Sequence, residues 1–280
     1  MLTRLVRVGA AGLCVAALLG SAAGSASARA PRAQASVVGG RAASLQEWGF
    51  TAAVLTPHTL CTGIVLAPTK VLTAAHCVGD PAILLVRTNS TSAFAGGELS
   101  SVANAAFAPG FAGGFQNDLA MLTLKTATIA PAIQLPSAAE DATYTQLGAP
   151  LAVAGFGNRN PLLGRQKIGT LTAADVSVRR CPLPAWAICD SGGRAGAAFR
   201  RLRGRLLRRK VKKSVCSGDS GGPLVARTPA GPRLIGIAEA SSGPRKPNPF
   251  YFVICGLKGF PSLHSRAGSY LDFIVGHLQP

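Results

Sequence analysis

Short apolar runs separated by turn-forming residues dominate the chain from about residue 50 onward. Many of the runs are four to eight residues long, rich in Val, Ile and Leu, and bounded by Gly, Pro, Asn or Thr. They include FTAAVLTP, GIVLAPTKVLTAA, AILLVRT, LAMLTLK, PLAVAGFG, GPLVART and RLIGIAEA. Runs of this length with turn signals between them are typical of strands in a sandwich or barrel. The pattern therefore predicts an all-β fold.

Two segments depart from this strand-like pattern. Ser269–Leu278 (SYLDFIVGHL) repeats its apolar residues at helical spacing, which predicts a short α-helix at the C-terminus. Ser137–Gly148 (SAAEDATYTQLG) interrupts the apolar runs near the middle of the chain and is the best candidate for a linker. We therefore expect two halves of comparable size, at 37–138 and at 139–280, with the helix in the second half.

The first 28 residues have the three parts of a secretory signal peptide. A positively charged start leads into the apolar Val8–Gly20, and Ala26-Ser27-Ala28 offers a cleavage site of small residues. The apolar stretch is too short to span a bilayer, and no later run reaches the roughly twenty residues that a spanning helix needs. We expect a secreted, extracellular protein with a signal peptide at 1–28, a short propeptide at 29–36 and no transmembrane segment.

Export changes how the cysteines are interpreted. The chain has seven cysteines, and Cys14 lies within the expected signal peptide. The even number that remains favours disulfides over metal ligands in an exported chain. The spacings also differ from the paired C-x-x-C patterns of zinc sites, so we expect no metal and no cofactor. The six remaining cysteines are Cys61, Cys77, Cys181, Cys189, Cys216 and Cys255.

Three short segments carry residues that suit acyl transfer. LTAAHC contains His76, QNDLAML places Asp118 between an amide and an apolar run, and CSGDSGGPL surrounds Ser220 with glycines. A serine hydroxyl is a weak nucleophile that needs a base, and the base needs an orienting acid. The developing oxyanion needs backbone N–H donors. Gly218 and Ser220 could form this oxyanion hole, because glycines permit a tight turn. Taken singly, each segment is as well explained by packing, a turn or a loop.

Together these segments resemble the chymotrypsin/trypsin-like serine peptidases. TAAHC, NDLAML and GDSGGPL occur in the family's chain order of His, Asp and Ser. The resemblance covers essentially Val37 to Leu278. It implies two six-stranded antiparallel β-barrels with a C-terminal α-helix, and a serine-type endopeptidase in which His76, Asp118 and Ser220 are catalytic.

The resemblance extends to the start of the mature chain. Val37-Val38-Gly39-Gly40 resembles the family's mature N-terminus. In that family the new α-amine pairs with the acid just before the nucleophile, here Asp219. This pairing implies a zymogen, since the amine exists only after cleavage and a buried charge without its partner costs several kcal/mol. Ser36 precedes the cut, so an activator of trypsin type has no basic residue there. The resemblance also implies the disulfides Cys61–Cys77, Cys181–Cys189 and Cys216–Cys255.

Substrate choice is expected to depend on Ser214, which the resemblance places at the base of the primary specificity pocket, together with Ser241 and Ser262. Trypsin-like enzymes carry an Asp at the base, so a neutral Ser favours an apolar or aromatic substrate residue. The segment GIAEASSG aligns with the family in two ways. One puts Glu239 where a Ser supports the catalytic acid, with like charges opposed next to Asp118, and could also bring Glu239 toward the pocket. The other slides two residues, to Ser241.

The segment Arg194–Lys213 holds ten Lys or Arg and no Asp or Glu, within a chain of formal net charge +18. One interpretation is a solvated, disordered insertion, which is usual for charge blocks. Another is a docking site for an anionic polymer or lipid surface, and the spacing of Phe199, Leu202 and Leu206 is compatible with a short basic helix. With one aromatic residue in the run, we expect no dedicated nucleic-acid binding.

Two functions from different classes follow. The first is a secreted serine endopeptidase, expected to be a monomer, that acts on protein or peptide substrates. The second is a protein with a protease fold that binds anionic surfaces through Arg194–Lys213, with weak or no catalysis. The complete set of three chemical groups favours the enzyme, because a binding protein does not need all three. A protease specific for Arg or Lys would also tend to cut its own basic segment, which again favours an apolar or aromatic preference.

Overall fold

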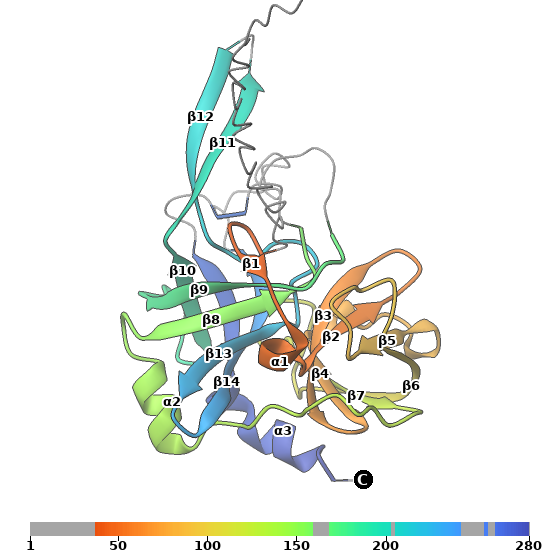
Figure 1. Ribbon diagram of the computed structural model, residues 1–280. Coiled ribbons are helices and arrows are strands. Elements are labelled where there is room, and N and C mark those ends of the chain that lie inside the picture. Colours follow the sequence, from red (N-terminus) through yellow and green to blue (C-terminus); the bar gives the residue numbers. More distant parts are fainter. Residues whose placement is uncertain (1–36, 159–167, 203–204, 242–254, 257–260, 280) are drawn as a thin grey trace, which may run out of the picture. The chain divides into compact units, whose positions relative to one another are not determined.

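The computed structural model describes residues 37–158, 168–202, 205–241, 255–256 and 261–279. The expected signal peptide and propeptide, residues 1–36, lie outside the described residues. Strands are the predominant secondary structure of the described residues, as the apolar runs predicted (Figure 1). Among these residues, none of the helices has the length and apolar character needed to cross a membrane.

The first barrel closes from six antiparallel strands in the order β2-β3-β4-β7-β6-β5 (Figure 1). Its strands are β2 (Thr51–Leu55), β3 (Leu60–Ala67), β4 (Lys70–Thr73), β5 (Leu85–Thr88), β6 (Glu98–Phe107) and β7 (Ala120–Leu124). The 3₁₀ helices η1 (Ala75–Cys77) and η2 (Pro81–Ile83) follow β4. Val54, Val65, Val71 and Leu122 are part of a buried cluster contributed by these strands, which accounts for their apolar runs.

The second barrel also closes from six antiparallel strands, because β8 pairs with β9 as well as with β13. Its strands are β8 (Pro150–Gly155), β9 (Thr172–Arg179), β10 (Ala187–Gly192), β13 (Pro223–Thr228), β14 (Gly231–Ser241) and β15 (Ser262–Arg266). A further short strand, β1 (Arg41–Ala42), adds to the edge of β9. Leu151, Val153, Leu224 and Ile235 belong to its buried core.

The helices are few and short. They are α1 (Leu45–Trp48), α2 (Ala138–Tyr144), η3 (Ala267–Tyr270) and the C-terminal α3 (Leu271–Gly276). The predicted linker contains α2, which begins with a capping box in which Ser137 and Glu140 each bind the other's backbone N–H. Two closed six-stranded antiparallel barrels and a terminal helix confirm the fold class predicted from the sequence.

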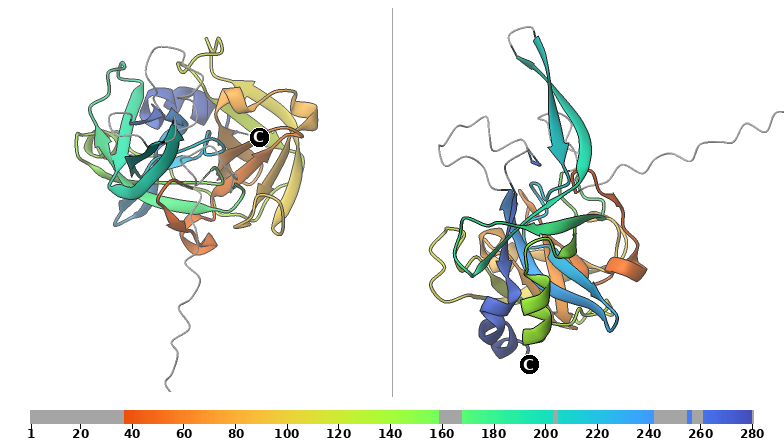
Figure 2. Two further views of the ribbon diagram at one scale, coloured as in Figure 1. Left: turned by 90° about the horizontal axis from the view of Figure 1, so that it is seen from above. Right: turned by 90° about the vertical axis from the view of Figure 1, so that its left-hand side faces the viewer.

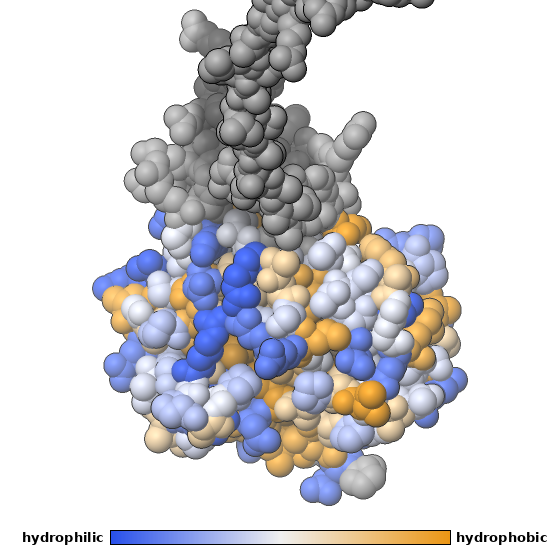
Figure 3. Space-filling view, viewed as in Figure 1, coloured by the Kyte–Doolittle hydropathy of each residue, from blue (hydrophilic) through white to orange (hydrophobic). Residues whose placement is uncertain are grey.

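Residues from both barrels share one hydrophobic cluster. Ile64, Leu72 and Met121 from the first barrel join Leu234 and Ile237 from the second in this cluster. Elsewhere, on the face drawn in Figure 3, hydrophilic and hydrophobic surface are interspersed among the described residues. Scattered apolar surface of this kind is ordinary for a folded protein and requires no partner to cover it.

The basic segment forms strands rather than the short helix that its apolar spacing allowed. Strands β11 (Arg194–Leu202) and β12 (Arg205–Lys212) pair antiparallel in a separate two-stranded sheet (Figure 2). Their register joins Ala198 to Arg209 and Leu202 to Arg205. A helical interpretation fails because the spacing of three apolar residues is weak evidence over so short a segment, and Gly204 at its centre lowers helix propensity.

Candidate active site

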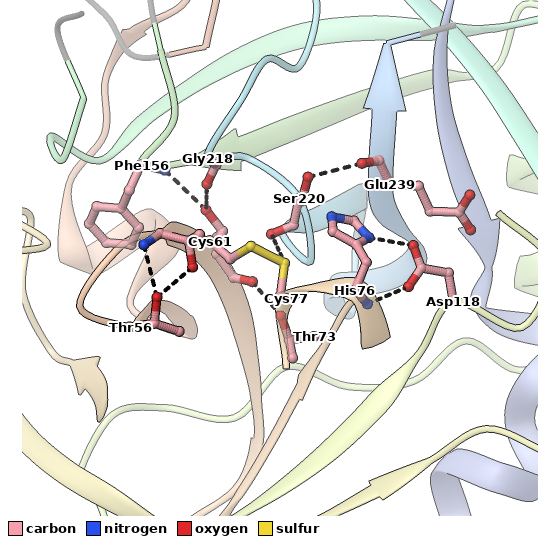
Figure 4. Close-up of a disulfide and its surroundings, with 12 residues drawn as sticks. Thr56, Cys61, Thr73, His76, Cys77, Asp118, Phe156, Gly218, Ser220 and Glu239 are labelled. Atoms are coloured by element: carbon pink, nitrogen blue, oxygen red, sulfur yellow. Dashed lines mark hydrogen bonds and ion pairs between the residues drawn. A yellow bond between two sulfur atoms is a disulfide. The ribbon is translucent and has the colours of Figure 1, made fainter. Parts of the chain in front are cut away.

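His76 and Asp118 lie together because the strands next to them are neighbours. His76 belongs to η1, just after β4, Asp118 comes just before β7, and β4 pairs with β7 through Thr73 and Ala120. Asp118 accepts the backbone N–H of His76 on Oδ1 at 2.8 Å, and its Oδ2 is 2.5 Å from His76 Nδ1. The carboxylate is 1% exposed, whereas the imidazole is 42% exposed. The buried Asp118 carboxylate therefore binds one edge of the His76 imidazole, and the ring as a whole remains accessible to solvent (Figure 4).

The loop that carries Asp118 is fixed by a contact from the C-terminus. Asn117 has a φ of 59°, a left-handed conformation that Asn tolerates better than most residues. Its N–H donates to the hydroxyl of Tyr270 at 3.1 Å, and that hydroxyl donates to Asn117 Oδ1 at 3.3 Å. The sequence predicted Tyr270 only as an apolar position of the terminal helix. Its role in positioning the acid loop was missed, because it depends on contact between residues far apart in the chain.

Ser220 lies in a glycine-rich turn. At two positions of this turn the backbone has a conformation that favours glycine. Gly218 and Gly221 have φ values of 95° and 80°. A Cβ at Gly221 would lie 2.2 Å from the carbonyl oxygen of Thr62, so a larger residue cannot fit there. That carbonyl belongs to the first barrel, and the N–H of Thr62 donates to the Ser220 carbonyl at 2.8 Å. These contacts attach the serine turn to strand β3, next to the disulfide between Cys61 and Cys77. Cys77 directly follows His76 in the chain.

The serine hydroxyl binds a carbonyl in this structure. Ser220 Oγ donates to the backbone oxygen of Glu239 at 2.9 Å. The sulfur of Cys77 lies 3.8 Å from the Ser220 carbonyl, which brings the serine turn against the loop of His76 (Figure 4). His76, Asp118 and Ser220 therefore gather at one place, although the hydrogen bond expected between Ser220 and His76 is replaced by the one to Glu239.

The backbone N–H groups of the serine turn divide into two sets. Those of Asp219, Gly221 and Gly222 donate to carbonyls within 2.6 to 2.9 Å. Those of Gly218 and Ser220 make no backbone hydrogen bond within the described part of the chain. The carbonyl of Gly218 is held by the hydroxyl of Thr62 at 2.8 Å, which orients this peptide. The two N–H groups expected to form an oxyanion hole therefore donate no backbone hydrogen bond among the described residues.

Three disulfides brace the site and the second barrel: Cys61–Cys77, Cys181–Cys189 and Cys216–Cys255. The first joins β3 to the helical turn of His76, and the third anchors the segment that leads to Ser220. The ligand-type atoms of Cys61, Cys77 and His76 lie within 4.8 Å of one another. Both sulfurs are already bonded to each other, so this group has no thiolate to offer a metal.

Asp219 is fully buried and is held by backbone groups. The N–H of Gly157 donates to Oδ1 and that of Cys216 to Oδ2, each at 2.8 Å. Burial raises the pKa of Asp219 to about 7, although these two N–H groups act in the opposite direction. Within the described residues no Lys, Arg or His forms an ion pair with it. Asp219 therefore occupies a place where a buried positive charge would be strongly favoured.

Val37 does not make the pair with Asp219 that the resemblance implies. Its nitrogen donates to the hydroxyl of Thr172 at 2.6 Å, and the N–H of Val38 donates to the Ser214 carbonyl at 3.1 Å. In this chain Val37 is still joined to Ser36, so its nitrogen is a neutral amide and cannot form an ion pair. The segment is nevertheless buried against the second barrel beside the predicted pocket residue.

The predicted pocket residues converge. The hydroxyls of Ser214 and Ser262 are 3.1 Å apart, and both residues are buried. Ser262 also accepts the N–H of Val215 at 3.3 Å. Ser241 lies opposite Ser262 in the β14–β15 ladder. The loop from 242 to 254 lies outside the described residues, and the two predicted pocket residues with described side chains, Ser214 and Ser262, carry hydroxyls without charge.

Glu239 lies beside the candidate catalytic acid. Strand β14 has a bulge between Ala238 and Ala240, which turns Glu239 into the interior, where it is 1% exposed. The hydroxyl of Ser265 hydrogen-bonds to its Oε1. Burial raises the pKa of Glu239 to about 8, and the charge of Asp118 adds to the rise while Ser265 opposes it. The geometry agrees with the first of the two alignments, in which Glu239 lies next to Asp118.

Comparisons with known proteins identify the family of the chain. Residues 37–256 match the family model described as Trypsin. A curated protein named Trypsin, from Saccharopolyspora erythraea, is 30% identical over 247 residues, which cover 85% of this chain and 96% of that protein. Coagulation factor XII of Rattus norvegicus is 28% identical over 261 residues, which cover 86% of this chain but 40% of factor XII. The chain belongs to the trypsin family and is a serine-type endopeptidase.

Proposed function

We propose that this protein is a secreted endopeptidase that hydrolyses peptide bonds with Ser220 as nucleophile, His76 as general base and then acid, and Asp118 as orienting acid. The observation that carries the proposal is the buried Asp118 carboxylate, which binds both the backbone N–H and Nδ1 of an accessible His76. This contact keeps the proton on Nδ1, so Nε2 is free to accept the serine proton.

The reaction proceeds by acyl transfer. Nε2 of His76 takes the proton of Ser220 Oγ as that oxygen attacks the substrate carbonyl, and the N–H groups of Gly218 and Ser220 receive the oxyanion. His76 then gives the proton to the leaving amine, and water repeats the cycle to release the acyl group. The Ser220 hydroxyl must first rotate away from the Glu239 carbonyl toward His76, since catalytic hydrogen bonds often tighten only when substrate is bound.

Cleavage before Val37 is proposed to activate the enzyme. It would create an α-amine in a segment that is already buried beside Ser214. The buried Asp219, whose pKa is raised to about 7 by desolvation, is the group that such an amine would neutralise. The requirement for a charge that only processing supplies would keep the secreted precursor inactive.

The neutral pocket base supports a preference for apolar or aromatic side chains at the cleaved position. Ser214 and Ser262 offer hydroxyls but no charge, so a lysine or arginine would lose its hydration without gaining an ion pair there. A peptide-library cleavage profile measures this preference directly. Cleavage mainly after Phe, Tyr, Leu or Met is expected, and cleavage mainly after Arg or Lys would contradict the proposal.

Secretion is proposed from the N-terminal sequence and supported by the disulfides. Three disulfides in one chain suit an oxidising compartment, where they form and persist. Sequencing the N-terminus of the protein recovered from culture medium tests both cleavages. It should begin after Ala28 in the precursor and at Val37 in the active form.

Chemical labelling tests the enzyme against the alternative of a binding protein without catalysis. Wild-type protein should react with a serine-directed fluorophosphonate and hydrolyse casein, and Ser220→Ala should do neither. Ser217→Ala is the matched control, because Ser217 is an exposed serine in the same turn, and it should label like the wild type. Failure of the wild type to label, after cleavage at Val37, would reject the enzyme and favour the binding protein.

A further inference from the structure

A second carboxyl group is enclosed beside the candidate triad, and the mechanism above does not use it. The backbone oxygen of Glu239 accepts the hydroxyl of Ser220 at 2.9 Å, so the position of this residue affects the nucleophile directly. Its Oε1 is bound by the hydroxyl of Ser265. Its Oε2 is buried and has no hydrogen-bond partner among the described residues. A buried oxygen without a partner is unusual and needs an explanation.

The neighbours of Glu239 explain why an ionised carboxyl is unfavourable there. Asp118, from the loop before β7, and Tyr270, from η3, are the ionisable groups that interact with it, and Asp118 is bound in turn to His76. Figure 4 shows the Glu239 and Asp118 carboxyls on the same side of the His76 ring. Two carboxylates enclosed together oppose each other's ionisation.

The two carboxyl groups differ in what stabilises a negative charge. Asp118 is bound by the N–H and Nδ1 of His76, at 2.8 and 2.5 Å. Glu239 has a single described donor, the Ser265 hydroxyl. The negative charge therefore belongs on Asp118 and the proton on Glu239. A proton on Oε2 also turns the oxygen without a partner from an acceptor into a donor group. Burial and the charge of Asp118 raise the pKa of Glu239 to about 8, which agrees with this assignment.

We propose that Glu239 is a positioning residue that works in its neutral form and whose ionisation inactivates the site as pH rises. In the neutral form it occupies the space beside Asp118 without opposing the charge that orients His76. It also keeps the bulge of β14, against which the serine turn packs, in a fixed position while the Ser220 hydroxyl turns toward His76. Ionisation would place a second negative charge in the enclosed space, which separates the two carboxyls and moves the bulge. The inference rests on the proposed role of the triad.

The dependence of kcat on pH tests this role. Each profile is measured with a peptide substrate from about pH 6 to 10 and divided by its own value at pH 7. We expect the wild-type kcat to fall by about tenfold for each pH unit above about 8, while KM changes little. Glu239→Gln keeps a neutral side chain of the same shape, so its profile should lack the fall that ionisation of Glu239 causes above about pH 8. Deprotonation of the Val37 α-amine would also lower kcat at high pH. It would do so equally in the wild type and in Glu239→Gln, so it does not account for a difference between them.

Two further variants separate this explanation from a general effect of mutation. Ser265→Ala removes the donor that favours the ionised carboxyl, so the fall in kcat should move to higher pH. Glu140→Gln is the matched control, because Glu140 lies in α2 and pairs with Arg233, and its profile should match the wild type. Coinciding profiles for wild type and Glu239→Gln, in an enzyme that labels and hydrolyses normally, would overturn the inference and leave the triad in place.

Carbon-13 NMR of the side-chain carboxyls provides a measurement that does not depend on catalysis. The chain has four glutamates, Glu47, Glu98, Glu140 and Glu239, so the signals can be assigned by substitution. One signal should titrate near pH 8, disappear in Glu239→Gln, and titrate at lower pH in Asp118→Asn. Titration of Glu239 below about pH 5 would overturn the inference. A wild-type protein that neither labels nor hydrolyses would overturn the proposed function and the positioning role together.

Discussion

Each barrel of this protein contains a histidine and an aspartate in close contact, and the two pairs differ in access to solvent. In the first barrel Asp118 is 2.5 Å from His76, and the imidazole is 42% exposed. In the second barrel Asp190, on β10, is also 2.5 Å from His264, on β15, but both side chains are completely buried. The contact in the second barrel is close but not aligned as a hydrogen bond.

The difference shows that the pair of residue types does not by itself make a catalytic site. His76 has one edge on a buried acid and the other open to substrate, and the serine turn lies against its loop. His264 has no open edge, so no substrate can reach it. A buried pair of this kind has paid a desolvation cost, and its loss should affect folding. We therefore expect changes to the first pair to affect kcat and changes to the second to affect stability.

The largest effect is expected from the same substitution made in both pairs. Asp118→Asn should lower kcat by about 10⁴-fold, because an amide stabilises the wrong tautomer of His76. Asp190→Asn should change kcat by less than about threefold. Both are measured as kcat on a peptide substrate, with intact folding checked by circular dichroism. Equal losses of kcat in the two variants would remove the distinction between the pairs.

The contribution of the second pair, Asp190 and His264, should be measurable in the free energy of unfolding. Removing one partner, in Asp190→Ala or His264→Ala, should destabilise the protein by about 3 kcal/mol or more, because the remaining polar group stays buried without its partner. Urea denaturation of an inactive Ser220→Ala background measures this without self-cleavage. The double variant Asp190→Leu with His264→Phe should recover part of the loss, since an apolar pair can replace a buried polar one. Single variants as stable as the parent would show that the buried pair contributes nothing.

The pH dependence of stability sharpens the comparison through two other buried carboxyls. The folded-state pKa values of Asp219 and Glu239 are about 7 and about 8, against ordinary values of 3.8 and 4.5. Between these limits the folded state keeps protons that the unfolded state releases. The free energy of unfolding should therefore fall as pH rises from about 4 to 8, by up to about 1.4 kcal/mol per pH unit for each group, and level off above.

Urea denaturation of Ser220→Ala between about pH 4 and 9 measures this slope in the chain that retains Ser36. Asp219→Asn should remove the contribution of that residue to the slope, which ends near pH 7, and Glu239→Gln should remove the contribution that continues to about pH 8. Below about pH 7 each variant should keep the slope that the other group contributes. Stability that rises over this range would contradict the burial of neutral carboxyls at both positions.

Much of this arrangement follows from the sequence, and the rest depends on pairing between strands far apart in the chain. The apolar runs predicted an all-β fold because the residue types within each run are enough to indicate a buried strand. The three short motifs identified His76, Asp118 and Ser220 as candidates. The second pair gave no such signal, because Asp190 and His264 meet only when β10 pairs with β15. The place of Glu239 likewise depends on one bulge, which shifts the register of β14 by a residue that no local pattern reveals.

A smaller effect is expected at the contact that holds the acid loop of the first pair. Tyr270→Phe removes the hydroxyl that binds the backbone and side chain of Asn117. The loss should destabilise the protein by about 1 kcal/mol and lower kcat by a few fold, since Asp118 is the next residue. Tyr144→Phe is a matched control at a tyrosine outside this contact. An effect on stability without any effect on kcat would show that the loop holds its position unaided.

The smallest effect on catalysis is expected from the basic ladder, which lies outside both pairs. A two-stranded sheet is at best marginally stable alone in water, and among the strands that the structure describes β11 and β12 pair only with each other. The ten Lys and Arg residues from Arg194 to Lys213 would attract an anionic surface, and docking on such a surface is the role that we propose for the ladder. Replacing 194–212 by a short Gly-Ser linker should leave kcat within about twofold.

The same replacement should abolish retention on a heparin column at about 0.15 M salt. Wild-type retention should fall steeply as salt is added, as expected for attraction between exposed charges. Neutralising two basic residues elsewhere, in Arg41→Gln with Arg227→Gln, is the control and should leave retention nearly unchanged. Unchanged retention after removal of the ladder would leave the basic segment without a docking role. The contrast between a catalytic and a structural His–Asp pair would then be the functional difference that remains between regions of the molecule.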